Sequence, residues 1–181
     1  QLKAFWNQYG NLITWTLILA LSGFAAWNGW NWWQRDQAAK ASAMFDQLDR
    51  AAQAGDAERA ARIFSDLKER FPRTAYAQQG ALLTARVQAE KAQPDAALAT
   101  LAWAADNAGE DEYRAIARLR AAGLLLDKKQ YEQALAQLDG AAQGKSAKAF
   151  EALLADRRGD VLLAQGKKDE ARQAYESAYR A

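Results

Sequence analysis

Hydrophobic and charged positions divide the chain into two parts. From Ala4 to Gln34 there is no charged residue over 31 positions, and residues 12–27 are apolar on all sides rather than along one stripe. The rest mixes alanine and leucine with charged residues. This mixture, together with residues that start and stop helices, predicts helices at 57–70, 75–92, 95–107, 111–127, 131–142, 147–165 and 168–180. Because residues 34–54 contain neither proline nor glycine, the uncharged helix is expected to continue into a first helix of the second part.

The uncharged segment predicts a transmembrane anchor over residues 1–35. A bilayer core about 30 Å thick requires roughly 20 apolar residues in a helix. Six of the seven tryptophans lie here, and tryptophan and tyrosine are enriched where a helix leaves the lipid. The expected aromatic belts are Trp6 and Tyr9 at one end and Trp27, Trp30, Trp32 and Trp33 at the other.

Two alternatives to the anchor stay open. The small residues Gly23 and Ala25 have the spacing of a signal-peptide cleavage site, although cleavage there would leave an exposed tryptophan-rich start. A buried core helix is the other, and tryptophans clustered at both ends argue against it. Lys3 precedes the segment and Arg35 and Lys40 follow it, so these charges alone leave the orientation undecided.

A repeat of 37 residues organises the second part. The repeat is aligned on one small residue in the second helix of each unit, called the anchor alanine. This residue is Ala60, Ala97, Ala134 and Ala171 in the four units. The large apolar position four residues later holds Phe64, Leu101, Leu138 and Tyr175, and the small position twelve residues before the anchor holds Leu48, Ala85, Ala122 and Gly159. The turn between the two helices of a unit has Gly55 and Gly166, with Ala92 and Lys129 in the middle units.

This spacing resembles the tetratricopeptide repeat, in which a small residue lets two antiparallel helices approach and a large one fills the neighbouring hole. The fold class predicted is therefore all-α: one N-terminal transmembrane helix, then a tetratricopeptide-repeat-like α-solenoid of about four helix pairs over residues 36–181.

The repeat pattern ends at Ala181, which we interpret as only part-way through its fourth unit. The apolar face of Tyr175, Ala178 and Tyr179 is then expected to be covered by a further segment, a partner or self-association.

Composition narrows the function. The chain has no histidine and no cysteine, which removes the commonest general base, metal ligand and thiolate nucleophile. Its 24 basic and 22 acidic residues are mixed, with no basic block for nucleic acid. We expect a protein that is not an enzyme and that has no catalytic, metal or cofactor site.

Three groups of charged residues are candidate sites. Glu110, Asp111 and Glu112 are interpreted as a helix start, where the helix dipole favours carboxylates, rather than as a metal site. Asp156 and Asp160 share a helix face and are interpreted as a polar inner surface rather than an acid–base pair. Lys145 and Lys148 are interpreted as solvated loop charges.

The candidate binding site is the concave groove that the first helix of each unit lines in tetratricopeptide domains. The predicted groove residues are Phe45, Leu82, Arg86, Ile116, Leu119, Leu126, Leu153, Asp156, Asp160 and Leu163. Many are apolar, which suits loosely specified hydrophobic segments of other proteins. The alternative is that part of these leucines belong to the domain's own core.

Several segments resemble the bacterial ancillary SecYEG translocon subunit family. They are QLKAFWNQYGN before the apolar segment, GWNWWQ after it, AKASAMFDQL at 39–48, RTAYAQQGALLTAR at 73–86 and DRRGDVLLAQGKKDEARQAYESA at 156–178. The resemblance implies a single-pass protein of the bacterial inner membrane with a cytoplasmic N-terminus and a periplasmic repeat domain. It implies as partners the SecYEG translocon, a membrane-anchored periplasmic chaperone of the prolyl-isomerase type, newly translocated unfolded proteins and membrane lipid.

The function implied is to help pass newly translocated proteins to periplasmic folding factors. The alternative is a membrane-anchored repeat scaffold for another envelope machinery, such as cell-wall or cytochrome maturation.

Overall fold

The computed structural model describes residues 2–181, with side chains from Tyr9 onward, and its regular elements in that range are all helices. The chain divides into two compact units, residues 1–40 and 41–181. The predicted boundary between anchor and repeat domain, at residues 35 and 36, lies a few residues before this division and stays a prediction.

The first unit is the N-terminal part of α1 (Leu2–Gln53), and this helix is long and apolar enough to cross a membrane. Its large side chains are exposed: 67% for Leu12 and 66% for Trp27. That exposure contradicts the alternative of a buried core helix. The hydroxyls of Thr14 and Thr16 donate to the carbonyls of Gly10 and Leu12, at 2.7 and 2.8 Å, so both hydroxyls are satisfied inside the helix, as a lipid environment requires.

The aromatic side chains of the predicted belts are described from Tyr9 onward, and their place at a membrane interface stays a prediction. Tyr9 is 42% exposed, and Trp27, Trp30, Trp32 and Trp33 are all exposed, with the Trp30 and Trp33 ring centroids 5.2 Å apart. Trp6 lies outside the residues whose side chains are described. As predicted, α1 continues without interruption to Gln53, and its residues from Ala41 onward belong to the second unit.

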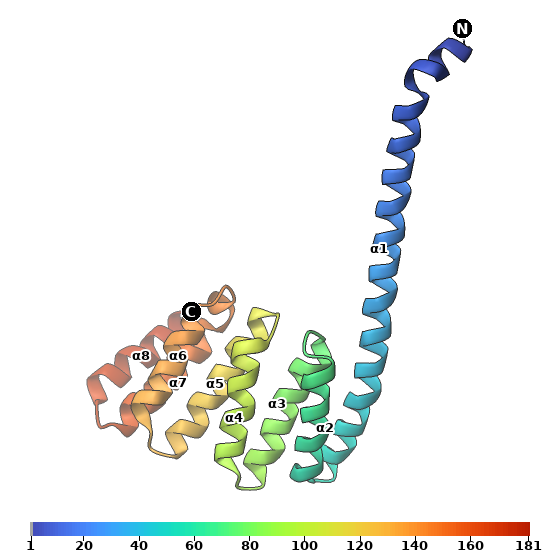
Figure 1. Cartoon of the computed structure of the whole chain (residues 1–181). Coiled ribbons are helices and arrows are strands. Elements are labelled where there is room, and N and C mark those ends of the chain that lie inside the picture. The colour runs from blue at the N-terminus through green and yellow to red at the C-terminus, as the bar shows by residue number, and fades with distance from the viewer. Residues whose placement is uncertain (1) are drawn as a thin grey trace. The chain divides into compact units, whose positions relative to one another are not determined.

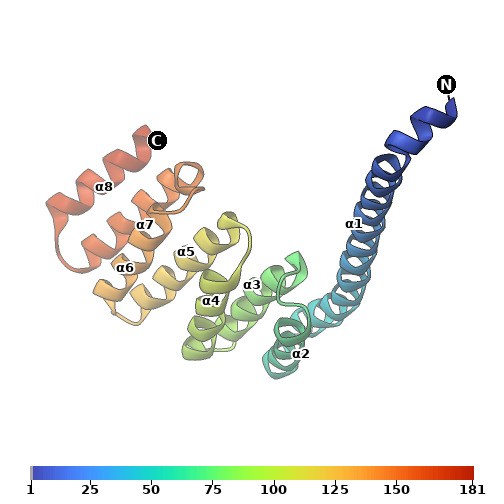
Figure 2. The same cartoon turned by 45° about the horizontal axis from the view of Figure 1, so that its top comes forward.

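The second unit is a row of antiparallel helix pairs (Figures 1 and 2). The end of α1 packs with α2 (Ala57–Arg70), α3 (Ala75–Glu90) with α4 (Pro94–Asn107), and α5 (Asp111–Asp127) with α6 (Tyr131–Ala142). The last pair is α7 (Glu151–Ala164) and α8 (Lys168–Arg180), preceded by the 3-10 turn η1 (Ala147–Phe150). Contacts of α3 with α5 and of α5 with α7 place the first helices of neighbouring units side by side along one face.

One expected helix start is corrected. Residues 147–150 form a 3-10 turn rather than the first turn of a longer helix, and Ser146 just before the turn is held by Asp111 and Glu112 of α5. Both helices of the fourth pair are present, with α8 running from Lys168 to Arg180. Of the apolar face expected at the end, Tyr179 is 93% exposed, whereas Tyr175 and Ala178 are half-buried.

The 37-residue repeat is visible in the packing. The anchor alanines Ala60, Ala97, Ala134 and Ala171 are 0, 0, 0 and 1% exposed. The large residues Phe64, Leu101 and Leu138 are 4, 1 and 0% exposed. In the fourth unit the ring of Tyr175 lies directly against Gly159, where a Cβ atom would collide with it. Small residues thus sit where helices approach, and larger ones fill the space beside them.

Local signals set the helix ends. The Asp56 carboxylate accepts the Arg59 N–H at 3.0 Å and caps α2, and Pro94 occupies the first turn of α4, where its missing N–H costs nothing. The Thr74 hydroxyl caps α3 through the Ala77 N–H. These residues mark the starts of α2, α3 and α4.

The turn inside each unit requires left-handed backbone. Gly55 and Gly166 have φ of +66° and +80°, and Ala92 and Lys129 at the equivalent positions have φ of +56° and +58°. Only glycine adopts this conformation without steric cost, and a residue with a Cβ loses roughly 1–2 kcal/mol. The repeat geometry therefore imposes strain on Ala92 and Lys129.

We expect Ala92→Gly and Lys129→Gly each to stabilise the domain by about 0.5–1 kcal/mol, because relief of strain exceeds the entropy that glycine adds to the unfolded chain. Neither side chain makes a hydrogen bond or ion pair in the described part of the chain. The measurement is urea unfolding of the full chain in detergent. Gly166→Ala is the converse control and should destabilise through its positive φ alone, because no atom within 4 Å would clash with the added Cβ. Destabilisation by both glycine variants would contradict this account.

Candidate partner-binding groove

The predicted groove residues separate into buried and exposed groups. Leu82 is only 7% exposed and belongs to the core formed by α1 to α5. Ile116, Leu119 and Leu126 are half-buried against the two larger core clusters, and the half-buried Phe45 ring lies 5.8 Å from that of Tyr76. Leu153 and Leu163 on α7 are 54 and 51% exposed. The role of these residues in binding a partner stays a prediction.

A cleft of about 440 Å³ lies along α3 and α5 and includes Arg86 and Leu119 of the predicted set. Its walls are largely alanine and leucine side chains, with charged groups among them. The remaining lining residues are Ala85, Ala89, Glu90, Leu101, Arg120, Gly123, Leu124, Asp127 and Arg157. The cleft is thus an apolar trough bordered by both signs of charge.

Arg120 is one of several lining residues that were not in the predicted set. Its guanidinium donates to the Leu82 carbonyl oxygen at 3.3 Å, while Arg86 pairs with Glu90 at 3.7 Å. Partial burial, and then the charge of Arg86, lower the pKa of Arg120. The repeat is the sequence signal that could have identified Arg120 as a lining residue. Arg120 and Arg157 are 37 residues apart, so they are equivalent positions, and both line the cleft.

Asp156 and Asp160 do not act on each other as a pair. Asp160 accepts the Tyr175 hydroxyl at 2.9 Å and forms an ion pair with Arg157 at 3.4 Å, whereas Asp156 is exposed. Burial, followed by the hydrogen bond to Asp160 and the charges of both aspartates, raises the pKa of Tyr175. Asp160 therefore connects α7 to α8.

The acidic residues at 110–112 begin α5. Asp111 and Glu112 lie in its first turn, and they also hold the loop after α6. The Asp111 carboxylate accepts the Ser146 N–H at 2.7 Å, and Glu112 accepts its hydroxyl at 2.9 Å. The described residues contain no group of three metal-ligating side chains. The carboxylates thus fasten one unit to the next.

Comparison with known proteins agrees with this fold. The family described as "Tetratricopeptide repeat-like domain" matches residues 3–181. Among solved structures, MamA from Desulfovibrio magneticus RS-1 has a TM-score of 0.60 and 17% identity, covering 77% of this chain and 73% of that one. At such low identity the likeness concerns the fold alone. Fold and repeat define a tetratricopeptide-repeat-like protein.

Two curated relatives extend over almost the whole chain. The "Ancillary SecYEG translocon subunit" of Neisseria gonorrhoeae is 30% identical over 178 residues, which are 97% of this chain and 83% of the relative. The protein of the same name from Haemophilus influenzae is also 30% identical, over 98% of this chain and 85% of its own length. The chain belongs to the ancillary SecYEG translocon subunit family. Membership suggests a non-catalytic role, and with the apolar helix it fits a single-pass inner-membrane protein.

The Tyr175–Asp160 contact predicts a pH dependence at the end of the domain. The raised pKa of folded Tyr175 means that its stabilising effect is complete below the unfolded value of about 10 and is lost as pH rises through the folded pKa. Tyr175→Phe keeps the ring against Gly159 and removes the titrating group. Between pH 8 and 11, the urea midpoint of the wild-type chain should therefore fall further than that of the variant. Equal falls would show that the hydroxyl does not contribute.

Proposed function

We propose that this chain is an inner-membrane accessory protein of the SecYEG translocon that helps pass newly translocated proteins to periplasmic folding factors. Its N-terminus lies in the cytoplasm and its repeat domain in the periplasm. The domain binds a membrane-anchored chaperone of the prolyl-isomerase type. The observation that supports this proposal most is the likeness to two translocon subunits over 97 and 98% of the chain, which includes both the apolar helix and the repeats.

The surface of the domain is suited to holding polypeptide segments loosely. Leu153 and Leu163 expose half of their surface on α7, near the carboxylates of Asp156 and Asp160. The cleft along α3 and α5 adds a second apolar region bordered by charges. Exposed apolar surface beside mixed charges gives affinity without strict sequence selection, which a protein receiving many different clients needs.

The chemistry of the chain supports a binding role. It contains neither histidine nor cysteine, and the shifted groups, Arg120 and Tyr175, each have a structural partner. Arg120 bonds to a backbone carbonyl and Tyr175 to Asp160, so both shifts follow from packing between helices rather than from an assembled acid–base pair.

Affinity purification of the full chain in mild detergent tests the proposal. SecYEG and a prolyl-isomerase-type chaperone should be recovered with it. Leu153→Ser with Leu163→Ser should reduce crosslinking to newly translocated proteins several-fold, because exposed apolar contacts are lost, while SecYEG recovery stays the same. Leu82 is unsuitable for this test, since truncating a buried leucine costs roughly 2–5 kcal/mol of stability.

The matched control is Ala102→Ser with Ala136→Ser, two exposed positions on the second helices α4 and α6, which should leave crosslinking unchanged. Recovery of cell-wall or haem-ligation proteins without SecYEG would contradict the proposal.

A further inference from the structure

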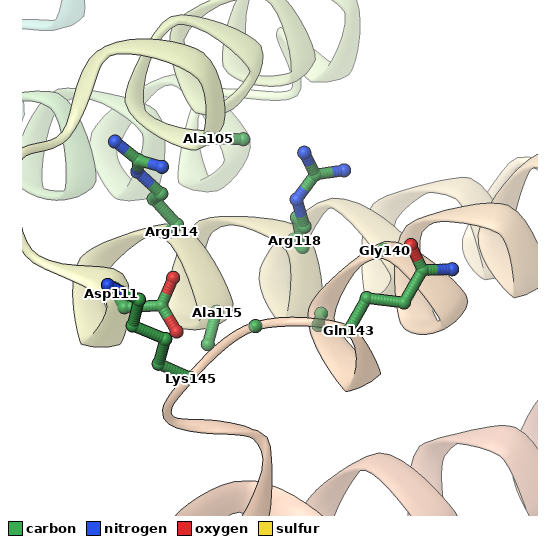
Figure 3. A pocket seen from close by; sticks show the side chains of 10 residues that line it. Ala105, Asp111, Arg114, Ala115, Arg118, Gly140, Gln143 and Lys145 are labelled. Atoms are coloured by element: carbon green, nitrogen blue, oxygen red, sulfur yellow. The ribbon is translucent and has the colours of Figure 1, made fainter.

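A second cavity, of about 310 Å³, lies at the end of the third helix pair (Figure 3). Its floor consists of small residues from three segments: Ala105 of α4, Ala115 of α5, and Gly140, Ala141 and Gly144 at the end of α6. Its polar lining is Asp111, Arg114, Arg118, Gln143 and Lys145. Figure 3 shows Arg114 and Arg118 projecting from α5 to the same side, as residues four apart on a helix do.

The cations that line this cavity outnumber its carboxylates by three to one. Asp111 is its only lining carboxylate, and its Oδ2 is used by the Ser146 N–H at 2.7 Å. Arg114 donates through Nε to the Ala108 carbonyl at 2.6 Å, which leaves its two terminal nitrogens available. In the structure as described, Arg118 and Lys145 have neither a hydrogen bond nor an ion pair. Three cations therefore face a small space with a single, engaged carboxylate.

The repeat shows that the fold does not need these arginines. The positions equivalent to Arg118 in the neighbouring units are Ala81 and Ala155. Gly140 stands where the second unit has Trp103. The third unit thus differs from both neighbours by a cation on α5, and from the second unit by the loss of a large side chain on α6. Like charges four residues apart also weaken a helix, so packing alone gives no reason for the pair.

We propose that this cavity binds the side-chain carboxylate of an acidic segment in a partner protein. The inference rests on the proposed function, in which the repeat domain binds polypeptides. The planar edge of a guanidinium matches a carboxylate. The terminal nitrogens of Arg114 and the unpaired guanidinium of Arg118 are available to bind one. The alanine methyl groups of the floor accommodate the methylene stem of glutamate, which a free inorganic anion would leave uncovered.

The experiment measures binding of two fluorescent peptides to the full chain in detergent: alternating alanine and glutamate, and the same peptide with glutamine. The wild-type chain should prefer the glutamate peptide by about tenfold, and the preference should shrink as salt is raised. Arg118→Gln, and Arg114→Gln with Arg118→Gln, should reduce the preference to below about threefold. The single variant should keep its helicity, because Arg118 has no polar partner to lose.

Arg59→Gln with Arg62→Gln is the matched control. Both arginines are exposed on α2, lie outside the cavity and change the net charge equally, so this variant should keep the preference. The inference is overturned if the wild-type chain shows no preference or the control loses as much. It is equally overturned if micromolar inorganic phosphate or phosphatidylglycerol vesicles displace the peptide. Recovery of SecYEG is measured with the same variants. Failure of the wild-type chain to recover SecYEG counts against the proposed function. The Arg118→Gln variant is expected to recover SecYEG as the wild-type chain does.

Discussion

Backbones of neighbouring helices in residues 41–181 approach each other at alanines that have almost no exposed surface, Ala60, Ala97, Ala134 and Ala171. Such close packing gives each pair many weak contacts and leaves no room for a larger side chain. A single pair cannot bury its apolar face alone, so the pairs must stack. The turn residues, including the strained Ala92 and Lys129, adopt left-handed backbone because this stacking fixes the direction in which each second helix returns.

Most of the fold could be predicted because its signals are local or repeated. The cap Asp56 and the first-turn proline Pro94 mark helix starts, and the 37-residue spacing identifies which alanines and turns are equivalent. The groove was harder to predict. Leu82 proved to be buried because α3 packs against helices on several sides, and in an alanine-rich helix the pattern does not separate a core face from an open one. The turn at 147–150 depends on Asp111 and Glu112, which hold Ser146 from another unit.

The same repetition distinguishes what the fold requires from what it does not. Positions that stay small in every unit are needed for helix packing. Arg118, by contrast, stands where neighbouring units have alanine, and its proximity to Gly140 exists only once α5 and α6 are packed. The sequence therefore indicates that the third unit differs from its neighbours at Arg118, and only the structure shows the cavity beside it. A domain with regular stacking and irregular surface residues can meet several partners while its core stays the same.

The most direct test of the close-approach account compares two alanines of α4. Ala97 is 0% exposed at the helix crossing, and Ala99 is exposed on the same helix. Leucine has nearly the helix propensity of alanine, so propensity does not separate the two sites. In urea unfolding of the full chain, Ala97→Leu should lower the free energy of unfolding by roughly 1–3 kcal/mol or more, and Ala99→Leu should change it by less than about 0.5 kcal/mol. Equal effects at both positions would show that the stacking does not depend on small residues where the helices meet.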